Sequence, residues 1–111
     1  MRHHICRAVA AMTAALALAA VLPAAAGDDA AKGRELARAL CAQCHMNEDQ
    51  GEKQGPMGIP SFASVANRPD QTFDGIVGWL KSLPPMMPNH HLTQDEMFDL
   101  AAFIMSLREE P

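Results

Sequence analysis

The residues best suited to carry out chemistry lie in one short stretch, Cys41-Ala42-Gln43-Cys44-His45. Two thiols three positions apart project from one turn, and each can add to one of the two vinyl groups of a single porphyrin. The imidazole of His45 follows the second thiol directly and then lies under the iron as its proximal ligand. The C-x-x-C-H spacing therefore predicts one covalently attached haem per chain, held by Cys41 and Cys44 with His45 on the iron.

Three other interpretations of this stretch are weaker. A thiol pair of the thioredoxin kind needs a strand–helix context, and the sequence shows no strand-like alternation. A zinc site needs four ligands, but the only other cysteine, Cys6, belongs to the N-terminal segment. A chance occurrence would leave a small domain without the disulfide, metal or cofactor that domains of this size need for stability.

The N-terminal segment has the layout of a secretory signal peptide. Met1 to Arg7 carries two arginines and no acid, Ala8 to Leu22 is small and apolar, and Pro23 to Ala26 offers a small-residue cleavage site. We expect a signal peptide over 1–26, a monohaem domain over 27–111, and a periplasmic location. The alternative is an uncut segment that stays as a membrane anchor.

The charge of the mature chain narrows the choice of partners. Seven basic residues stand against thirteen acidic ones in 27–111, which gives a net charge near −6. This balance argues against nucleic acid and anionic membrane surfaces, and favours redox proteins with a basic docking face. We expect a monomer that contacts the membrane only if the N-terminal segment is retained.

Helical patterns surround the motif. Strong helix formers from Ala30 to Leu40 follow two acids and predict a helix that runs into the motif, whereas the glycines and prolines of 46–58 predict a loop. A second helix is predicted by apolar residues on one face and ends at Pro84-Pro85. Its apolar positions are Phe73, Ile76, Val77, Leu80 and Leu83.

The last helix is the best specified element. Thr93 and Glu96 have the spacing of a capping box, and an apolar stripe follows them. The stripe consists of Met97, Leu100, Ala101, Ile104 and Leu107. Every element predicted for the mature chain is helical, so the expected fold class is all-α.

With these residues in view, the mature chain resembles the class I cytochrome c family over essentially its whole length. Gly33 lies eight residues before Cys41, and Leu100 to Ile104 looks like the family's matching C-terminal segment. The resemblance implies three to five short helices around one haem, with the first and last helices crossing closely at Gly33. It also implies a proline whose carbonyl accepts a hydrogen bond from His45. Pro60 fits that position best, and Pro56 is the alternative.

The resemblance further implies a methionine as sixth ligand of the iron, just before the last helix. Met87, followed by Pro88, fits this position, while Met86, His90 and His91 remain competitors. A thioether favours ferrous iron and raises the reduction potential. Trp79 is expected either beside the haem, where its indole N–H could reach a propionate, or simply buried in the core.

These expectations lead to a function. Iron with both axial positions filled has no site for substrate, so we expect a one-electron carrier and no enzymatic activity. A haem enzyme or a gas-binding sensor with an open or labile sixth site is the alternative. A subunit of a larger oxidase or dehydrogenase would also transfer electrons, and the sequence does not distinguish it from a free carrier.

Overall fold

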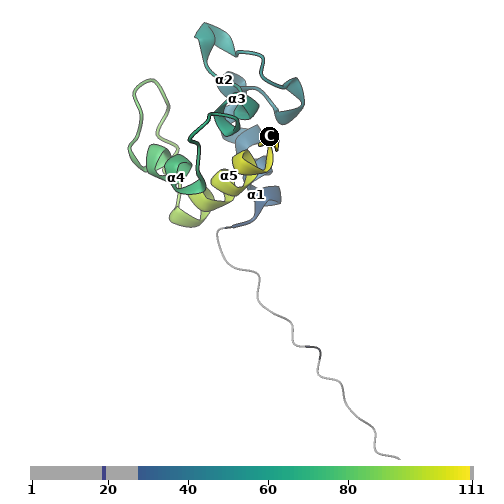
Figure 1. The fold of residues 1–111 in the computed structure, drawn as a ribbon. Helices are drawn as coiled ribbons and strands as arrows, with labels where there is room; N and C mark the ends of the chain where they lie inside the picture. The colour runs from purple at the N-terminus through teal and green to yellow at the C-terminus, as the bar shows by residue number, and fades with distance from the viewer. Residues whose placement is uncertain (1–18, 20–27, 111) are drawn as a thin grey trace, which may run out of the picture.

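The computed structural model describes Ala19 and residues 28–110, and the described part is helical with no strand. Apart from Ala19, the predicted signal segment lies outside the described residues. Five α-helices follow one another in the described chain (Figure 1): α1 Ala30–Leu36, α2 Ala42–His45, α3 Phe62–Ala66, α4 Phe73–Lys81 and α5 Gln94–Ser106. Within residue 19 and 28–110, no helix is both long and apolar enough to cross a membrane.

The crossing of α1 and α5 joins the two ends of the domain (Figure 1). Gly33 is buried at the contact, where an added Cβ would overlap the backbone carbonyl of Asp99. The side chain of Asp99, itself buried, accepts a hydrogen bond of 2.8 Å from the backbone N–H of Asp29. The close approach predicted at Gly33 is therefore confirmed, since only glycine lets the two backbones come this near.

The core lies between α5 and the other helices. Its buried members come from α3, α4, α5 and the segment after α1, and Phe103 and Leu100 are the largest that are fully enclosed. The complete set is Ala37, Phe62, Ala66, Ile76, Val77, Leu100, Ala101, Phe103 and Ile104. The apolar faces predicted for the second and last helices are thus the faces that pack.

A π-helical segment, Ala37–Cys41, separates α1 from α2. The N–H of Ala42 donates to the carbonyl of Ala37, five residues back. The sequence predicts one helix running into the motif. The structure keeps the chain helical there but inserts this wider turn immediately before the attachment residues. Single π-turns inside helices are common at functional sites.

The last helix begins as its sequence predicts. The side chain of Thr93 accepts from the N–H of Glu96 at 3.2 Å, and the carboxylate of Glu96 accepts from the N–H of Thr93 at 2.8 Å. The prediction of Leu83 on the apolar face of α4 is wrong. The helix ends at Lys81, and Leu83 has φ +50° with 57% of its surface exposed. Leu83 precedes Pro84, whose ring disfavours helical backbone at the preceding residue.

Candidate haem-binding site

The attachment residues lie on one turn at the end of the N-terminal helical segment. Cys41 is half-buried, Cys44 is exposed, and the two are not joined by a disulfide. Burial raises the pKa of the Cys41 thiol to about 11. An attacking thiol in disulfide exchange has a depressed pKa, so Cys41 does not have the environment of such a thiol.

The ring of His45 is held from two sides by groups of this chain. Its Nδ1 lies 2.7 Å from the carbonyl oxygen of Pro60. The ring of Phe62 stacks on the imidazole with centroids 5.7 Å apart and planes 22° apart, and Phe62 in turn meets Phe103 edge-on. Because a carbonyl only accepts, Nδ1 must carry the proton, which leaves the lone pair of Nε2 for a metal. Of the two prolines considered, Pro60 is the one at this position.

The turn that carries Pro60 packs directly on the attachment turn. A Cβ added at Gly55 would overlap the backbone carbonyl of Cys44, and the N–H of Gly55 donates to the carbonyl of Ile59 at 2.8 Å. The sequence analysis missed Gly55 and Phe62 as parts of the site. The Gly-Pro pair at 55–56 and the aromatic residue shortly after Pro60 are the signals that could have found them.

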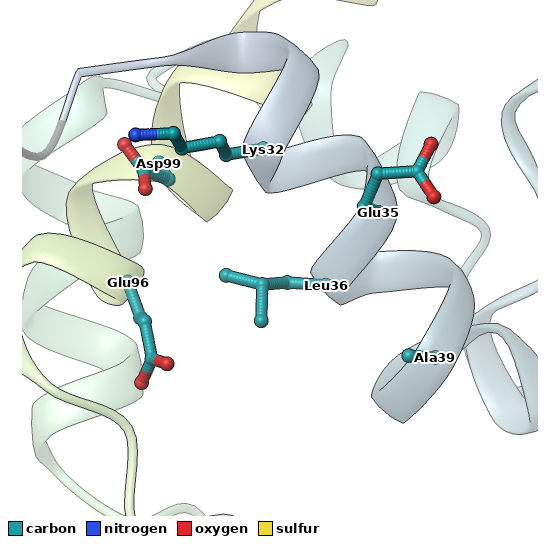
Figure 2. Close-up of a pocket in the computed structure, with 6 residues that line it drawn as sticks. All are labelled: Lys32, Glu35, Leu36, Ala39, Glu96 and Asp99. Carbon is teal, nitrogen blue, oxygen red and sulfur yellow. The ribbon is translucent and has the colours of Figure 1, made fainter.

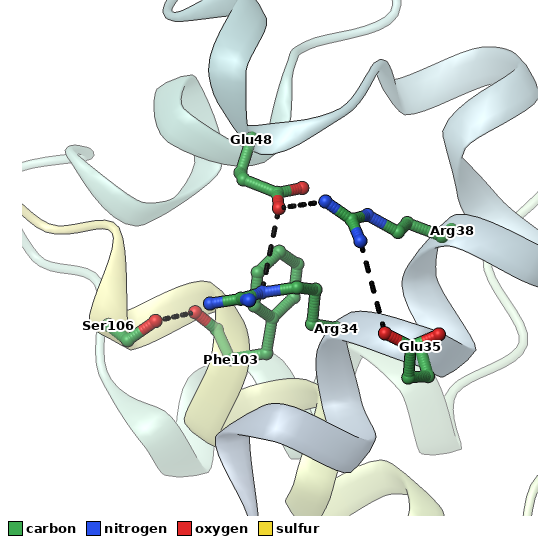
Figure 3. A network of polar contacts seen from close by, with 6 residues as sticks. All are labelled: Arg34, Glu35, Arg38, Glu48, Phe103 and Ser106. Atoms are coloured by element: carbon green, nitrogen blue, oxygen red, sulfur yellow. Dashed lines mark hydrogen bonds and ion pairs between the residues drawn. The ribbon is translucent and has the colours of Figure 1, made fainter.

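An ion-pair network ties the chain after His45 back to α1 (Figure 3). One carboxylate oxygen of Glu48 accepts from Nη2 of Arg38 at 2.8 Å and lies 3.5 Å from Nε of Arg34. Arg38 also lies 3.9 Å from Glu35. These contacts hold the exit of the attachment turn against the helix that enters it. The sequence analysis missed this network, because charged residues ten or more positions apart give no pairing signal.

The connection between α4 and α5, residues 82–93, carries Met86 and Met87 and is called the methionine loop below. Met87 is half-buried, and its N–H donates to the carbonyl of Pro84 at 3.2 Å. Met86 is 80% exposed, and His90 and His91 are exposed as well. Figure 1 shows this connection arching outward beside α4. Of the four competitors for the sixth position, only Met87 turns partly into the protein.

Trp79 lies on α4 and is 58% exposed. The expectation that it is simply buried in the core is therefore wrong. Among the described residues, no hydrogen bond or ring contact joins Trp79 or Met87 to the group formed by His45 and Pro60. The structure thus brings the proximal residues together and leaves these two on separate elements.

A shallow surface pocket of about 560 Å³ lies between α1 and α5 (Figure 2). Its lining consists of Lys32, Glu35, Leu36, Ala39, Glu96 and Asp99. None of the predicted attachment or ligand residues takes part in it, so this pocket is separate from the haem-binding site.

Two thiols on one turn beside an imidazole of fixed tautomer are the donor set that a covalently bound haem requires, so the residues present fit the group. Comparison with known proteins decides the family. The family model described as Cytochrome c matches residues 30–108. The chain belongs to the cytochrome c family.

The cytochrome also has a characterised relative of similar size. It is 40% identical over 93 residues to "Cytochrome c-552" of Bradyrhizobium diazoefficiens, an alignment that covers 84% of this chain and 88% of the relative. No solved structure gives a significant match. The resemblance to a class I c-type cytochrome, the all-α fold and the covalently attached haem c predicted from the sequence are thus confirmed. The protein is a monohaem c-type cytochrome of electron transfer.

Proposed function

We propose that this cytochrome is an exported one-electron carrier, not an enzyme, whose haem iron is bound by His45 and Met87. The observation that carries the proposal is the 2.7 Å contact between Nδ1 of His45 and the carbonyl of Pro60. It fixes the tautomer, leaves the lone pair of Nε2 for the iron and strengthens the imidazole as a donor to the metal. His45 is thereby a strong, permanent proximal ligand, and Cys41 and Cys44 hold the group covalently.

Burial supports Met87 over its competitors on the distal side. A ligand to a protein-held haem must turn into the protein, and Met87 does so while Met86, His90 and His91 face solvent. Pro84 and Pro88 restrict the backbone on either side of the loop, which limits the entropy lost when a weak thioether ligand is held in place. With both axial positions filled by this chain, no position is left for a substrate.

The sequence supports the proposed cellular location and the proposed redox partners. The basic, apolar and small-residue regions of 1–26 support export to the periplasm. The net charge near −6 of 27–111 supports steering towards redox proteins with a basic face, as a monomer that meets its partners transiently. Trp79, half exposed on α4, is proposed to lie beside the haem, with its indole N–H free to donate.

Optical spectra of the holoprotein test the ligation. The oxidised protein should show the weak long-wavelength band of sulfur-to-iron charge transfer, and carbon monoxide should leave the reduced spectrum unchanged. Met87→Ala should remove that band, admit carbon monoxide and lower the potential, because the soft donor that favours ferrous iron is lost.

Met86→Ala is the matched control, since it removes the neighbouring thioether. It should keep both the band and the resistance to carbon monoxide. If the two variants exchange these results, Met86 is the ligand. Carbon monoxide binding by the unaltered protein would favour a sensor or enzyme with an open sixth position.

A further inference from the structure

The surface pocket between α1 and α5 forms a groove apart from the haem-binding residues (Figure 2). We call it the α1–α5 groove. Its volume of about 560 Å³ lies within the range of about 300–1,000 Å³ that is usual for ligand pockets. Because the groove is shallow, it suits the protruding side chains of a protein better than a small molecule, which needs to be enclosed on most sides.

The lining of the groove combines apolar side chains with an excess of negative charge. Leu36 and Ala39 are apolar, and Figure 2 shows Leu36 pointing from α1 across the groove towards α5. The other four lining residues are charged, and three carboxylates against one ammonium leave a net charge of −2. These four are Lys32, Glu35, Glu96 and Asp99.

Two of the three carboxylates have no cation beside them. None of the ion pairs formed within residue 19 and 28–110 includes Glu96, Asp99 or Lys32. Glu96 accepts from the N–H of Thr93, and Asp99 accepts from the N–H of Asp29, each at 2.8 Å. Asp99 is only 6% exposed, so little water screens its charge and a cation placed beside it would be bound more strongly than at an exposed carboxylate.

We propose that the α1–α5 groove binds a basic, amphipathic segment of a partner protein, with a basic side chain beside Glu96 and Asp99 and an apolar one against Leu36 and Ala39. The inference deepens the proposed attraction to basic partners, and it takes from that proposal only the sign of the partner's charge.

Charge complementarity decides the kind of occupant. An acidic segment would be repelled by the lining, and a purely apolar one would desolvate the two carboxylates without supplying a cation. The hydrocarbon stem of an arginine or lysine can lie on the apolar lining while its charged end reaches a carboxylate. Neither the attachment cysteines, His45 nor Met87 lines the groove, so a partner bound in it leaves these residues free.

NMR titration of the reduced, ¹⁵N-labelled holoprotein with short synthetic peptides tests the proposal. The probe peptide contains leucine, arginine and alanine, and two control peptides replace either its arginines with glutamine or its leucines with serine. Only the first peptide should shift the amide resonances of the groove residues, because both the charge and the apolar contact are needed. Shifts confined to another face, or equal binding of the three peptides, would overturn the proposal.

Glu96→Gln removes one charge from the groove and keeps the capping box, in which glutamine also serves. It should weaken the binding of the probe peptide about three- to tenfold, because a hydrogen bond to a charged group is lost. Glu109→Gln is the matched control, since it removes the same charge at an exposed position outside the groove. It should change the affinity by less than about twofold. Equal weakening by both variants would overturn the proposal, because net charge would then explain the attraction.

Ala39→Arg tests the same site by filling it. Ala39 is exposed in the groove, so the new guanidinium can take the place of the partner's and should weaken peptide binding more than about tenfold. Gly78→Arg is its control, because it adds the same charge on α4, where the space around Gly78 is open. Groove resonances that shift with protein concentration alone would assign the groove to a second copy of the chain and overturn the proposal.

Peptide binding and iron ligation are measured by different signals. The sulfur-to-iron band of the oxidised protein tests Met87, whereas the groove resonances test the binding of the peptide. Loss of the band with the groove shifts retained would contradict the ligation alone. A normal band with no groove shifts would overturn the α1–α5 groove as a docking site and leave the electron-carrier function standing.

Discussion

The two sides of the haem-binding site are held by different means. On the proximal side, His45 is fixed by the Pro60 carbonyl and the Phe62 ring, and Gly55 packs on the backbone of Cys44. On the proposed distal side, Met87 lies in a loop, and its N–H donates one backbone hydrogen bond to the carbonyl of Pro84.

Backbone strain is present on both sides. Positive φ, which side chains with a Cβ adopt at a cost, occurs at Leu83, Met86 and His91 in the methionine loop and at Met46 and Met57 on the proximal side. The difference therefore lies in the contacts: several hold His45 in place, whereas one backbone hydrogen bond supports the proposed ligand Met87. Substitutions on the proximal side should therefore damage the fold, whereas substitutions on the distal side should change the iron with less effect on stability.

The largest effect should come from Phe62→Ala. Phe62 is 3% exposed and packs on both His45 and Phe103, so its removal leaves a cavity in the core behind the imidazole. We expect a loss of about 3–5 kcal/mol in the free energy of unfolding. Denaturant unfolding of the holoprotein measures it. If Phe62→Ala costs less free energy of unfolding than Met87→Ala, the methionine loop supports the fold more than the proximal side does.

A smaller effect is expected from Gly55→Ala, which pushes a methyl group against the backbone of Cys44. The turn must shift, and we expect a loss of about 1–3 kcal/mol in the free energy of unfolding. Gly78→Ala is the control, because the space around Gly78 in α4 is open. It should stabilise the protein by about 1 kcal/mol through helix propensity. Equal effects of the two variants would show that the Gly55 contact is unimportant.

Met87→Ala tests how much the methionine loop contributes to the free energy of unfolding. Met87 is only half-buried and sits in a loop, so we expect a loss of about 1–2 kcal/mol, within the usual range for single substitutions. The reduction potential should fall at the same time. Thermal unfolding and potentiometric titration of one sample separate the two effects. A loss as large as that for Phe62→Ala would show that both sides support the fold equally.

The smallest effect should be a gain in stability, produced by Leu83→Gly. Leu83 is held at φ +50° with most of its side chain in solvent, and glycine adopts such backbone without steric cost. The relief of about 1–2 kcal/mol of strain is partly offset by the greater entropy of glycine in the unfolded chain. We therefore expect Leu83→Gly to raise the free energy of unfolding by less than about 1 kcal/mol. Destabilisation instead would mean that the loop carries no strain at Leu83.

The sequence predicts local features of the fold better than contacts between distant parts of the chain. The capping box of Thr93 and Glu96 is local, so the residues alone predict it, whereas the Gly33 crossing and the Pro60 position are predicted through the resemblance to the cytochrome c family. Helix α3 was missed because five residues give no periodicity, although Ser61 accepts from the N–H of Ser64 as its N-cap. The π-turn before Cys41 was missed because Ala-rich sequence suits either helix.

Contacts between distant parts of the chain left no sequence signal. Arg108, just after α5, donates from Nη1 to the carbonyl of Gln71 at 2.9 Å, and the N–H of Glu109 donates to Oδ1 of Asn67 at 2.9 Å. These bonds anchor the C-terminal end to the connection between α3 and α4. Each bond joins residues about 40 positions apart, one through the backbone carbonyl of Gln71 and the other through the side-chain amide of Asn67. No local pattern in the sequence predicts such a pairing.

The pairing of α1 with α5 also sets an order of events as the chain is made. The bond from Asp29 to Asp99 spans 70 residues, so the helix pair cannot close until nearly the whole domain has emerged. A chain that emerges amino end first therefore presents Cys41, Cys44 and His45 before α5 is available to pack on α1. The thiols stay open to chemical modification during that interval, and the two helices close only afterwards.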